Sequence, residues 1–96
     1  MRTMMRVTIP VEAGNRAIAD GTLPKTIEAA MESLKPEAAY FVDNGGERSA
    51  LLVFDLADAS DIPSIAEPFF QNLNASVEFS PVMNAEDLQA GFGKMG

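Results

Sequence analysis

The stretch "EAAYFVDNGGERSALLVFDLAD", Glu37 to Asp58, carries the strongest strand and turn signals in the chain. Two β-rich runs flank the dipeptide Asn44-Gly45, and such a dipeptide predicts a two-residue hairpin turn because both central residues of a type I′ turn need positive φ. The second run, residues 50–56, is apolar on both sides of the strand. A strand of this composition is covered on both faces. We therefore expect a β-hairpin whose second strand is central in its sheet.

The segments before the hairpin predict a strand and a helix. "MMRVTIPV", residues 4–11, alternates apolar and polar side chains up to Val11, which is typical of a half-buried strand. "GTLPKTIEAAMESLKP", residues 21–36, has apolar residues at helical spacing. Thr22 is a plausible N-cap, and Pro36 stops the helix. We expect the strand and the helix to pack against each other.

The connection between them, "VEAGNRAIADGTLPKT", contains two glycines but no phosphate-binding motif. A Walker loop needs G-x-x-x-x-G-K-[ST], whereas these glycines are seven residues apart. We expect Gly14 to end the strand connection, Asn15 to start a short helical turn, and Gly21 to be its left-handed C′ residue. Asn15 and Arg16 would then border a cleft between the first helix and the sheet, where they could contact a polar ligand group.

The segments after the hairpin predict a second helix, a last strand and a tail helix. The helix lies in "ADASDIPSIAEPFFQNLNA", begins at Ser60 or Asp61, and contains Pro68, which should kink or split it. "SVEFSPV" alternates as a strand, and Asn84 with Asp87 forms a capping box before a short helix that ends near Gly91.

The order β-α-β-β-α-β predicts one domain over residues 1–96: an α+β, ferredoxin-like plait with a four-stranded antiparallel sheet and two helices on one face. The other face would be mixed, because the third strand brings apolar residues to both sides. We expect a second copy to cover it, sheet to sheet, as a homodimer. Arg6 and Glu78 fall on this face, on neighbouring strands, so we expect a cross-strand or intersubunit ion pair.

Composition excludes several classes of function. The net charge is −7, and the seven Lys and Arg residues are scattered, which argues against nucleic-acid binding. The chain has no His and no Cys, so catalytic triads, thiol nucleophiles and ordinary zinc or histidine-ligated haem sites are excluded. The acids of "DLADASD" suit turns and caps better than a calcium loop. We expect no cofactor, no metal, no membrane span, and a cytoplasmic location as the default.

The chain also resembles a known group of proteins. The element order, the "NG" hairpin and the tail resemble the dimeric α+β-barrel superfamily of ferredoxin-like proteins. A group of small, uncharacterised bacterial proteins is similar over nearly the whole length, in "GNRAIADGTLPKTIE", "LKPEAAYF", "IAEPFF", "NASVEF" and "PVMNAEDL". The superfamily includes cofactor-free monooxygenases, haem-handling enzymes, lactone isomerases and effector-binding modules. Haem-handling members commonly use a His and small monooxygenases often a pocket Trp, and this chain has neither.

The stretch "AEPFFQN" suggests a ligand site. A proline-kinked helix that carries Phe69 and Phe70 can leave an apolar pocket against the sheet, to which Tyr40 and Phe54 could contribute. Tyr40 or Asn72 would be its polar anchor for a small apolar or amphipathic ligand. Core packing of the same aromatics is the alternative.

Two functions therefore stay open: a small-molecule-binding protein, perhaps a cofactor-independent enzyme, or a non-catalytic dimerising binding or assembly module. An enclosed pocket with converging polar atoms supports the first, and a fully packed helix–sheet interface supports the second. No residue is assigned a catalytic role.

Overall fold

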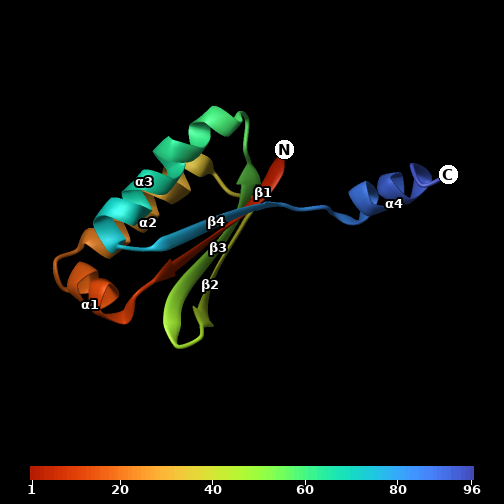
Figure 1. Cartoon of the computed structure of the whole chain (residues 1–96). Coiled ribbons are helices and arrows are strands. Elements are labelled where there is room, and N and C mark those ends of the chain that lie inside the picture. Colours follow the sequence, from red (N-terminus) through yellow and green to blue (C-terminus); the bar gives the residue numbers. More distant parts are fainter.

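The computed structural model describes residues 1–96 and has a mixed α+β fold with one four-stranded antiparallel sheet (Figure 1). The elements along the chain are β1 (Arg2–Ile9), α1 (Val11–Ala19), α2 (Thr22–Leu34), β2 (Ala38–Asn44), β3 (Glu47–Asp55), a 3-10 turn (Ala59–Asp61), α3 (Ile62–Leu73), β4 (Ser76–Pro81) and α4 (Ala85–Gly93). The strand order is β2-β3-β1-β4, which is consistent with a ferredoxin-like plait. None of the helices has the length and apolar character needed to cross a membrane.

The hairpin is confirmed, and β3 lies between β2 and β1 as expected. Its turn, however, lies one residue later than the sequence suggested. Asn44 still pairs with Glu47, and the two turn residues are Gly45 and Gly46, with φ of 61° and 87°. Glycine adopts positive φ without a steric cost, so two consecutive glycines take both turn positions. Asn44 stays in the strand, where its amide donates to Thr8 Oγ1 at 3.2 Å.

The segment between β1 and α2 corrects two expectations. Pro10 is the N-cap of α1, with φ of −57°, so Val11 begins a helix and does not continue the strand. Gly14 does not end a connection but lies buried inside this nine-residue helix. Proline ends the strand because it cannot donate a backbone hydrogen bond and its fixed φ suits a helix entry. Gly21 is left-handed, with φ of 81°, as expected.

The two long helices differ from expectation only in detail. Gly21, not Thr22, is the N-cap of α2. Asp61 occupies the N-cap position of α3 without a side-chain cap bond, and Asp58 caps the preceding 3-10 turn. The helix α3 runs through Pro68 without being split.

The hydrophobic core lies between the helix layer and the sheet. Its largest fully buried side chains are Phe54, Phe69, Met5, Leu52, Leu73 and Val7. Each such side chain contributes about 1.5–3 kcal/mol by leaving water. No buried side-chain nitrogen or oxygen lacks a hydrogen-bond partner. The polar side-chain atoms buried around this core are therefore all hydrogen-bonded within the chain.

The tail helix α4 stands away from this body (Figure 1). The capping box of Asn84 and Asp87 is confirmed, and the helix ends at Gly93, two residues after Gly91. The chain measures 54 × 28 × 18 Å along its principal axes. Its radius of gyration is 15.1 Å, against about 12.5 Å expected for a compact chain of this length. The difference reflects the projecting arm.

Candidate binding surfaces

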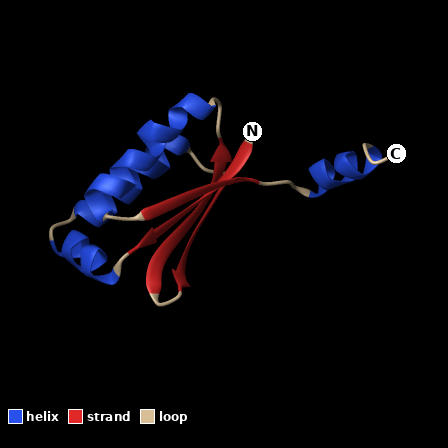
Figure 2. Cartoon of the chain, in the orientation of Figure 1, coloured by secondary structure: helices blue, strands red, loops and turns tan.

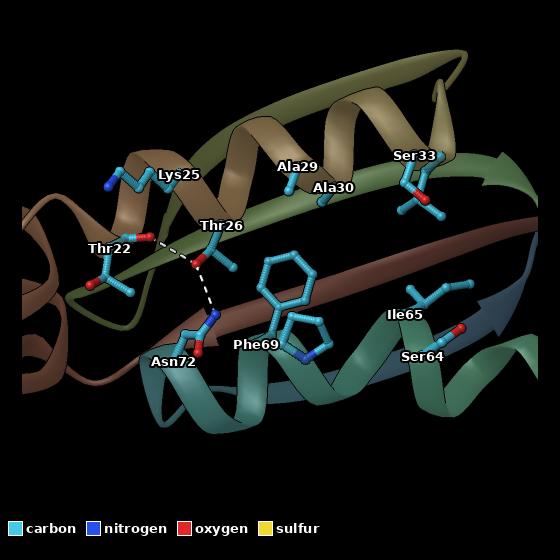
Figure 3. Close-up of a pocket in the computed structure, with 12 residues that line it drawn as sticks. Thr22, Lys25, Thr26, Ala29, Ala30, Ser33, Ser64, Ile65, Phe69 and Asn72 are labelled. Atoms are coloured by element: carbon cyan, nitrogen blue, oxygen red, sulfur yellow. Dashed lines mark hydrogen bonds between the residues drawn. The ribbon is translucent and has the colours of Figure 1, made fainter.

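A first surface is the groove between α2 and α3, which we call the interhelix groove (Figure 3). It has a volume of about 470 Å³. Its lining residues are Thr22, Lys25, Thr26, Ala29, Ala30, Ser33, Leu34, Ser64, Ile65, Pro68, Phe69 and Asn72. Ala29, Ala30 and Ser33 of α2 are too small to fill the space opposite α3, so the two helices leave a hollow between them.

The interhelix groove has a hydrogen-bonded polar end, while the two hydroxyls of Ser33 and Ser64 lie at its other end (Figure 3). Asn72 Nδ2 donates to Thr26 Oγ1 at 3.3 Å, and Thr26 Oγ1 donates to the Thr22 carbonyl at 2.7 Å (Figure 3). Lys25 lies at the same end, while Ile65 lies toward the other (Figure 3). Ligand clefts of about 300–1,000 Å³ commonly combine an apolar lining with a few placed polar groups. This groove can accept an elongated amphipathic molecule whose polar end meets Lys25 and Asn72.

A second surface is the groove between α2 and the β2–β3 hairpin, which we call the hairpin groove. It has a volume of about 630 Å³. Its lining residues are Ile9, Leu23, Pro24, Ile27, Glu28, Phe41, Val42, Asp43, Arg48, Ser49 and Ala50. The helices do not cover β2 fully, and Phe41 is 59% exposed although its neighbour across the strands, Ala50, is buried.

A third surface is the side of the sheet that faces away from the helices, which we call the open sheet face. All of α1, α2 and α3 lie on the other side (Figure 2). The strand registers place on this face Met4, Arg6, Thr8, Ala38, Tyr40, Val42, Ser49, Leu51, Val53, Ser76, Glu78 and Ser80. Its apolar side chains lie on β2 and at Leu51, Val53 and Met4 of the central strands, whereas Arg6, the hydroxyls of Thr8 and Ser49 and the β4 edge are polar.

A small polar cluster lies at the hairpin end of the open sheet face. Thr8 Oγ1 and Ser49 Oγ lie 3.3 Å apart, and Ser49 Oγ donates to the Val7 carbonyl at 2.8 Å. The amide of Asn44 also donates to Thr8. These hydroxyls are satisfied within the chain, so the cluster holds β1, β2 and β3 together and offers few free polar groups.

The structure does not bring the residues of the expected ligand site into one pocket. Phe69 and Asn72 both line the interhelix groove. Phe54 is 2% exposed and lies in the core, while Phe70 is 41% exposed on α3. Tyr40 lies on the open sheet face and is 64% exposed. The expectation that these aromatics share a cavity between helix and sheet is therefore corrected: core packing takes Phe54 and closes that space.

Tyr40 lies on the opposite face of the sheet from the expected one, and the sequence could not show this because β2 is apolar on both sides. Successive strand residues point to opposite faces, and Phe41 takes the helix side, so Tyr40 must take the other. In "AAYFV" the alternating side chains are apolar or aromatic on both faces of the strand, so only the pairing of Phe41 with Ala50 shows which set faces the helices.

Asn15 and Arg16 lie on the exposed part of α1. Asn15 Oδ1 accepts a hydrogen bond from Arg48 Nη2 at 3.0 Å, and Arg48 Nη1 donates to the Val11 carbonyl at 3.4 Å. Asn15 thus fastens α1 to β3. The sequence offered no indication of this contact, because Arg48 lies 33 residues further along the chain.

Thr26, Phe41 and Arg48 contribute to the grooves and were not singled out from the sequence. Thr26 is a polar residue on the otherwise apolar side of α2, which is the one local feature that could have marked it.

The charged side chains form few contacts. Arg6 lies directly opposite Glu78 in the β1–β4 register, as expected, yet the two do not form an ion pair within the chain. The ion pairs are those of the N-terminal amine with Asp55 at 2.8 Å, Arg2 with Glu37 at 2.7 Å, and Arg2 with Asp87 at 3.3 Å. No group of three or more acidic side chains is arranged to hold a metal ion.

Two charged groups have shifted pKa values. The hydrogen bond and the charge of Glu37 raise the pKa of the Arg2 guanidinium, which therefore stays charged. Hydrogen bonds from Thr22, its side chain first and its backbone N–H second, lower the pKa of Asp20. Both residues act at element ends: Arg2 beside α4, and Asp20 before α2.

The fold and these surfaces define a small mixed α+β protein with a packed core, two apolar grooves and one uncovered sheet face. No protein-family model matches the chain, and no curated protein matches it in sequence.

Proposed function

We propose that this protein is a dimerising binding module in which two copies pair through the open sheet face. The observation that supports the proposal is the contrast between the two sides of the sheet. The helix side of the sheet is covered by the hydrophobic core, and its buried polar groups are hydrogen-bonded. On the other side, Tyr40 and Val42 are exposed and Met4, Leu51 and Val53 are partly exposed. A contiguous apolar face on a small protein usually marks an interaction site.

A second copy suits this face because the face carries apolar side chains together with both signs of charge, Arg6 and Glu78. A two-fold pairing can bring the apolar side chains of one sheet against the same residues of the other, and the polar β4 edges to the rim. The result is a dimeric α+β barrel. We accordingly propose that the chain belongs to the dimeric α+β-barrel superfamily of ferredoxin-like proteins, an assignment supported by the antiparallel strand order β2-β3-β1-β4.

The proposal is tested by the mass of the protein in solution. Light scattering at micromolar concentration should give twice the chain mass of 10.3 kDa. Tyr40→Glu should shift the protein toward monomer, because it places a charge on an exposed position of the proposed interface. Ile18→Glu is the matched control, since Ile18 is comparably exposed on α1, away from the sheet. A stable monomer in the unchanged protein refutes dimerisation.

A second candidate function is the binding of a small amphipathic ligand in the interhelix groove. The polar end built by Asn72 and Thr26 favours it, because convergent polar atoms beside an apolar lining are typical of ligand sites. A fold alone does not define a reaction, so the proposal concerns binding and not catalysis.

Ligand binding is tested by a thermal-shift screen of metabolites, followed by NMR titration of each hit. A true ligand should perturb the amide signals of Thr26, Ala30 and Asn72. Asn72→Ala should weaken its binding, whereas Gln71→Ala, one residue away on α3 and outside the groove, should not. Signals that move only in the hairpin groove would place the ligand elsewhere and refute this site.

A further inference from the structure

The outer edge of β2 is an open strand edge. β2 is the terminal strand of the sheet and pairs on one side only, with β3 (Figure 1). Its middle exposes Tyr40, Phe41 and Val42 by 64%, 59% and 40%. Its sequence, AAYFVDN, contains neither proline nor lysine, and its register with β3 runs without a bulge. An apolar edge that lacks these features is a template for pairing with another strand.

The hairpin turn determines which backbone groups of this edge are free. Asn44 and Glu47 flank the two-residue turn, so their N–H and C=O groups bond to each other. The backbone groups of an antiparallel strand then alternate between the paired side and the outer side. Those of every second residue point outward: Ala39, Phe41 and Asp43. None of them forms a hydrogen bond with a turn, a loop or a side chain, so they are free to pair.

The opposite edge of the sheet is better protected. β4 has only six residues, SVEFSP, and its outward faces are largely polar. Glu78 lies in its middle and Pro81 ends it, and both a charge and a proline discourage pairing at an edge. The two edges therefore differ, and β2 is the one suited to pairing.

β2 is complementary to itself in the antiparallel direction. Pairing about Phe41 sets Phe41 opposite Phe41 and Ala39 opposite Asp43, so all of the outward backbone groups find a partner. It also sets Tyr40 opposite Val42 on the open sheet face. Aromatic residues opposite each other or opposite β-branched residues stabilise neighbouring strands. No two like charges are directly opposite in this register.

The neighbouring registers are less favourable. Pairing about Tyr40 sets Asp43 opposite Glu37, and like charges directly opposite each other destabilise a pair of strands. Pairing about Val42 sets Ala39 opposite the first glycine of the turn, where no strand remains to accept its bonds. One register is therefore preferred, which a strand of unrelated sequence would not provide.

We propose that β2 pairs antiparallel with β2 of a second copy of this chain, about a two-fold axis at Phe41 perpendicular to the sheet. This contact is separate from the sheet-face dimer and goes beyond it. The helices of both copies lie on the same side of one continuous sheet. The two hairpin grooves lie side by side, and each Phe41 ring lies beside the other. The contact uses one strand of each copy, so we expect it to be the weaker of the two and to form above micromolar concentration.

Hydrogen exchange measured by NMR tests the pairing with an internal control. The amides of Ala39, Phe41 and Asp43 should exchange roughly tenfold more slowly when the protein concentration is about ten times the dissociation constant of the edge contact. The amides of Tyr40 and Val42 bond to β3 and should be protected already in dilute protein. The sheet-face dimer alone would not produce this alternation, because it covers a face and not an edge.

Charged variants of Phe41 test the same contact by sedimentation. Phe41 points to the helix side, so these variants leave the open sheet face unchanged. Phe41→Lys and Phe41→Glu should each raise the dissociation constant of the edge contact about fivefold or more, because like charges meet at the axis. An equal mixture of the two variants should associate more tightly than either alone. Ile18→Lys, on α1 and 52% exposed, is the control and should have no effect.

The outcomes separate the two contacts. Alternating, concentration-dependent protection and recovery in the mixture support the edge pairing. Protection of Phe41 at every concentration would show that the edge is covered within one chain and would overturn it, as would a mixture that fails to recover. A protein that stays at twice the chain mass at all concentrations, with Phe41 unprotected, overturns the edge pairing and leaves the sheet-face dimer standing. A dimer that Phe41→Lys converts wholly to monomer overturns the sheet-face dimer instead.

Discussion

The side-chain amide of Asn72 on α3 donates a hydrogen bond to Thr26 Oγ1 on α2 at 3.3 Å, across 46 residues of sequence. Thr26 is 6% exposed, and its hydroxyl donates a hydrogen bond to the Thr22 carbonyl at 2.7 Å. One buried hydroxyl therefore joins two helices and lies at the hydrogen-bonded end of the interhelix groove (Figure 3).

Replacing this hydroxyl should destabilise the protein modestly. Thr26→Val keeps the shape of the side chain and removes both hydrogen bonds, so we expect the free energy of unfolding to fall by about 0.5–1.5 kcal/mol. Asn72 is exposed and can turn to water, which limits the loss. Urea denaturation measures it, with Ser33→Ala, an exposed hydroxyl on the same helix, as control. Equal effects of the two variants would show that the interhelix hydrogen bond does not contribute to stability.

Gly14 and Arg48 should be energetically coupled. A Cβ at position 14 would clash with Arg48 Nη1, while Ile9 Cγ2 would lie at 3.4 Å, close to ordinary contact. In the natural chain, Gly14→Ala should be near neutral, because a gain in helix propensity of about 0.5–1 kcal/mol is offset when the guanidinium leaves Asn15.

The coupling appears when Arg48 is already shortened. In an Arg48→Ala background, Gly14→Ala should stabilise by about 0.5–1 kcal/mol, since the guanidinium that would clash with the new methyl group is gone. A double-mutant cycle in urea gives the coupling free energy. The same effect of Gly14→Ala in both backgrounds would show that Arg48 moves aside at no cost.

Arg6 and Glu78 should matter most in the dimer. They are directly opposite on β1 and β4 but unpaired in the single chain, so a second copy on the open sheet face can bring them a partner. Arg6→Glu places like charges opposite each other and should cost about 0.2–1 kcal/mol, in addition to weakening the dimer. The charge-swapped protein, Arg6→Glu with Glu78→Arg, should recover the loss. Unchanged sedimentation and melting temperature for Arg6→Glu would argue against any pairing.

Asp20 should make a pH-dependent contribution. Its pKa is lowered by hydrogen bonds from Thr22. A carboxyl with a lowered pKa in the folded state stabilises the protein above its unfolded pKa of about 3.9, and that stability is lost as the pH falls through the folded value. Asp20→Asn should therefore melt at a lower temperature than the natural protein near neutral pH, and the gap should close in acid.

NMR titration of the Asp20 carboxyl carbon checks the cause. Thr22→Val removes the hydroxyl donor and should move the pKa of Asp20 back toward its ordinary value. If the melting temperatures of the Asp20→Asn and natural proteins differed by the same amount at every pH, the carboxylate would have no role in the stability of this turn.

Most elements could be predicted from the sequence because their causes are local. The alternation of β1 ends where Pro10 removes a donor, the capping box of Asn84 and Asp87 lies within four residues, and Gly21 needs positive φ. The structure differs from the prediction where two neighbouring residue pairs could each form the turn. The turn used Gly45 and Gly46 because two adjacent glycines cost less than one glycine and an asparagine.

The candidate site could be predicted only in part. Phe69 and Asn72 both line the interhelix groove because they lie three residues apart on α3, which places them on the same side of the helix. Tyr40 was assigned to the wrong side because the face taken by an edge strand depends on its pairing with β3.

Local patterns in the chain are enough to predict the order and type of the elements, the hairpin and the central place of β3, and the composition excludes His and Cys from any site. Three features become apparent only in the folded chain: Arg48 holds α1 through Asn15, Thr26 contacts Asn72, and α4 stands clear of the body. The difference is one of range along the chain. Caps, turns and alternation act over a few residues, whereas the hydrogen bonds of Arg48 with Asn15 and of Asn72 with Thr26 join side chains 33 and 46 residues apart, once packing has brought them together.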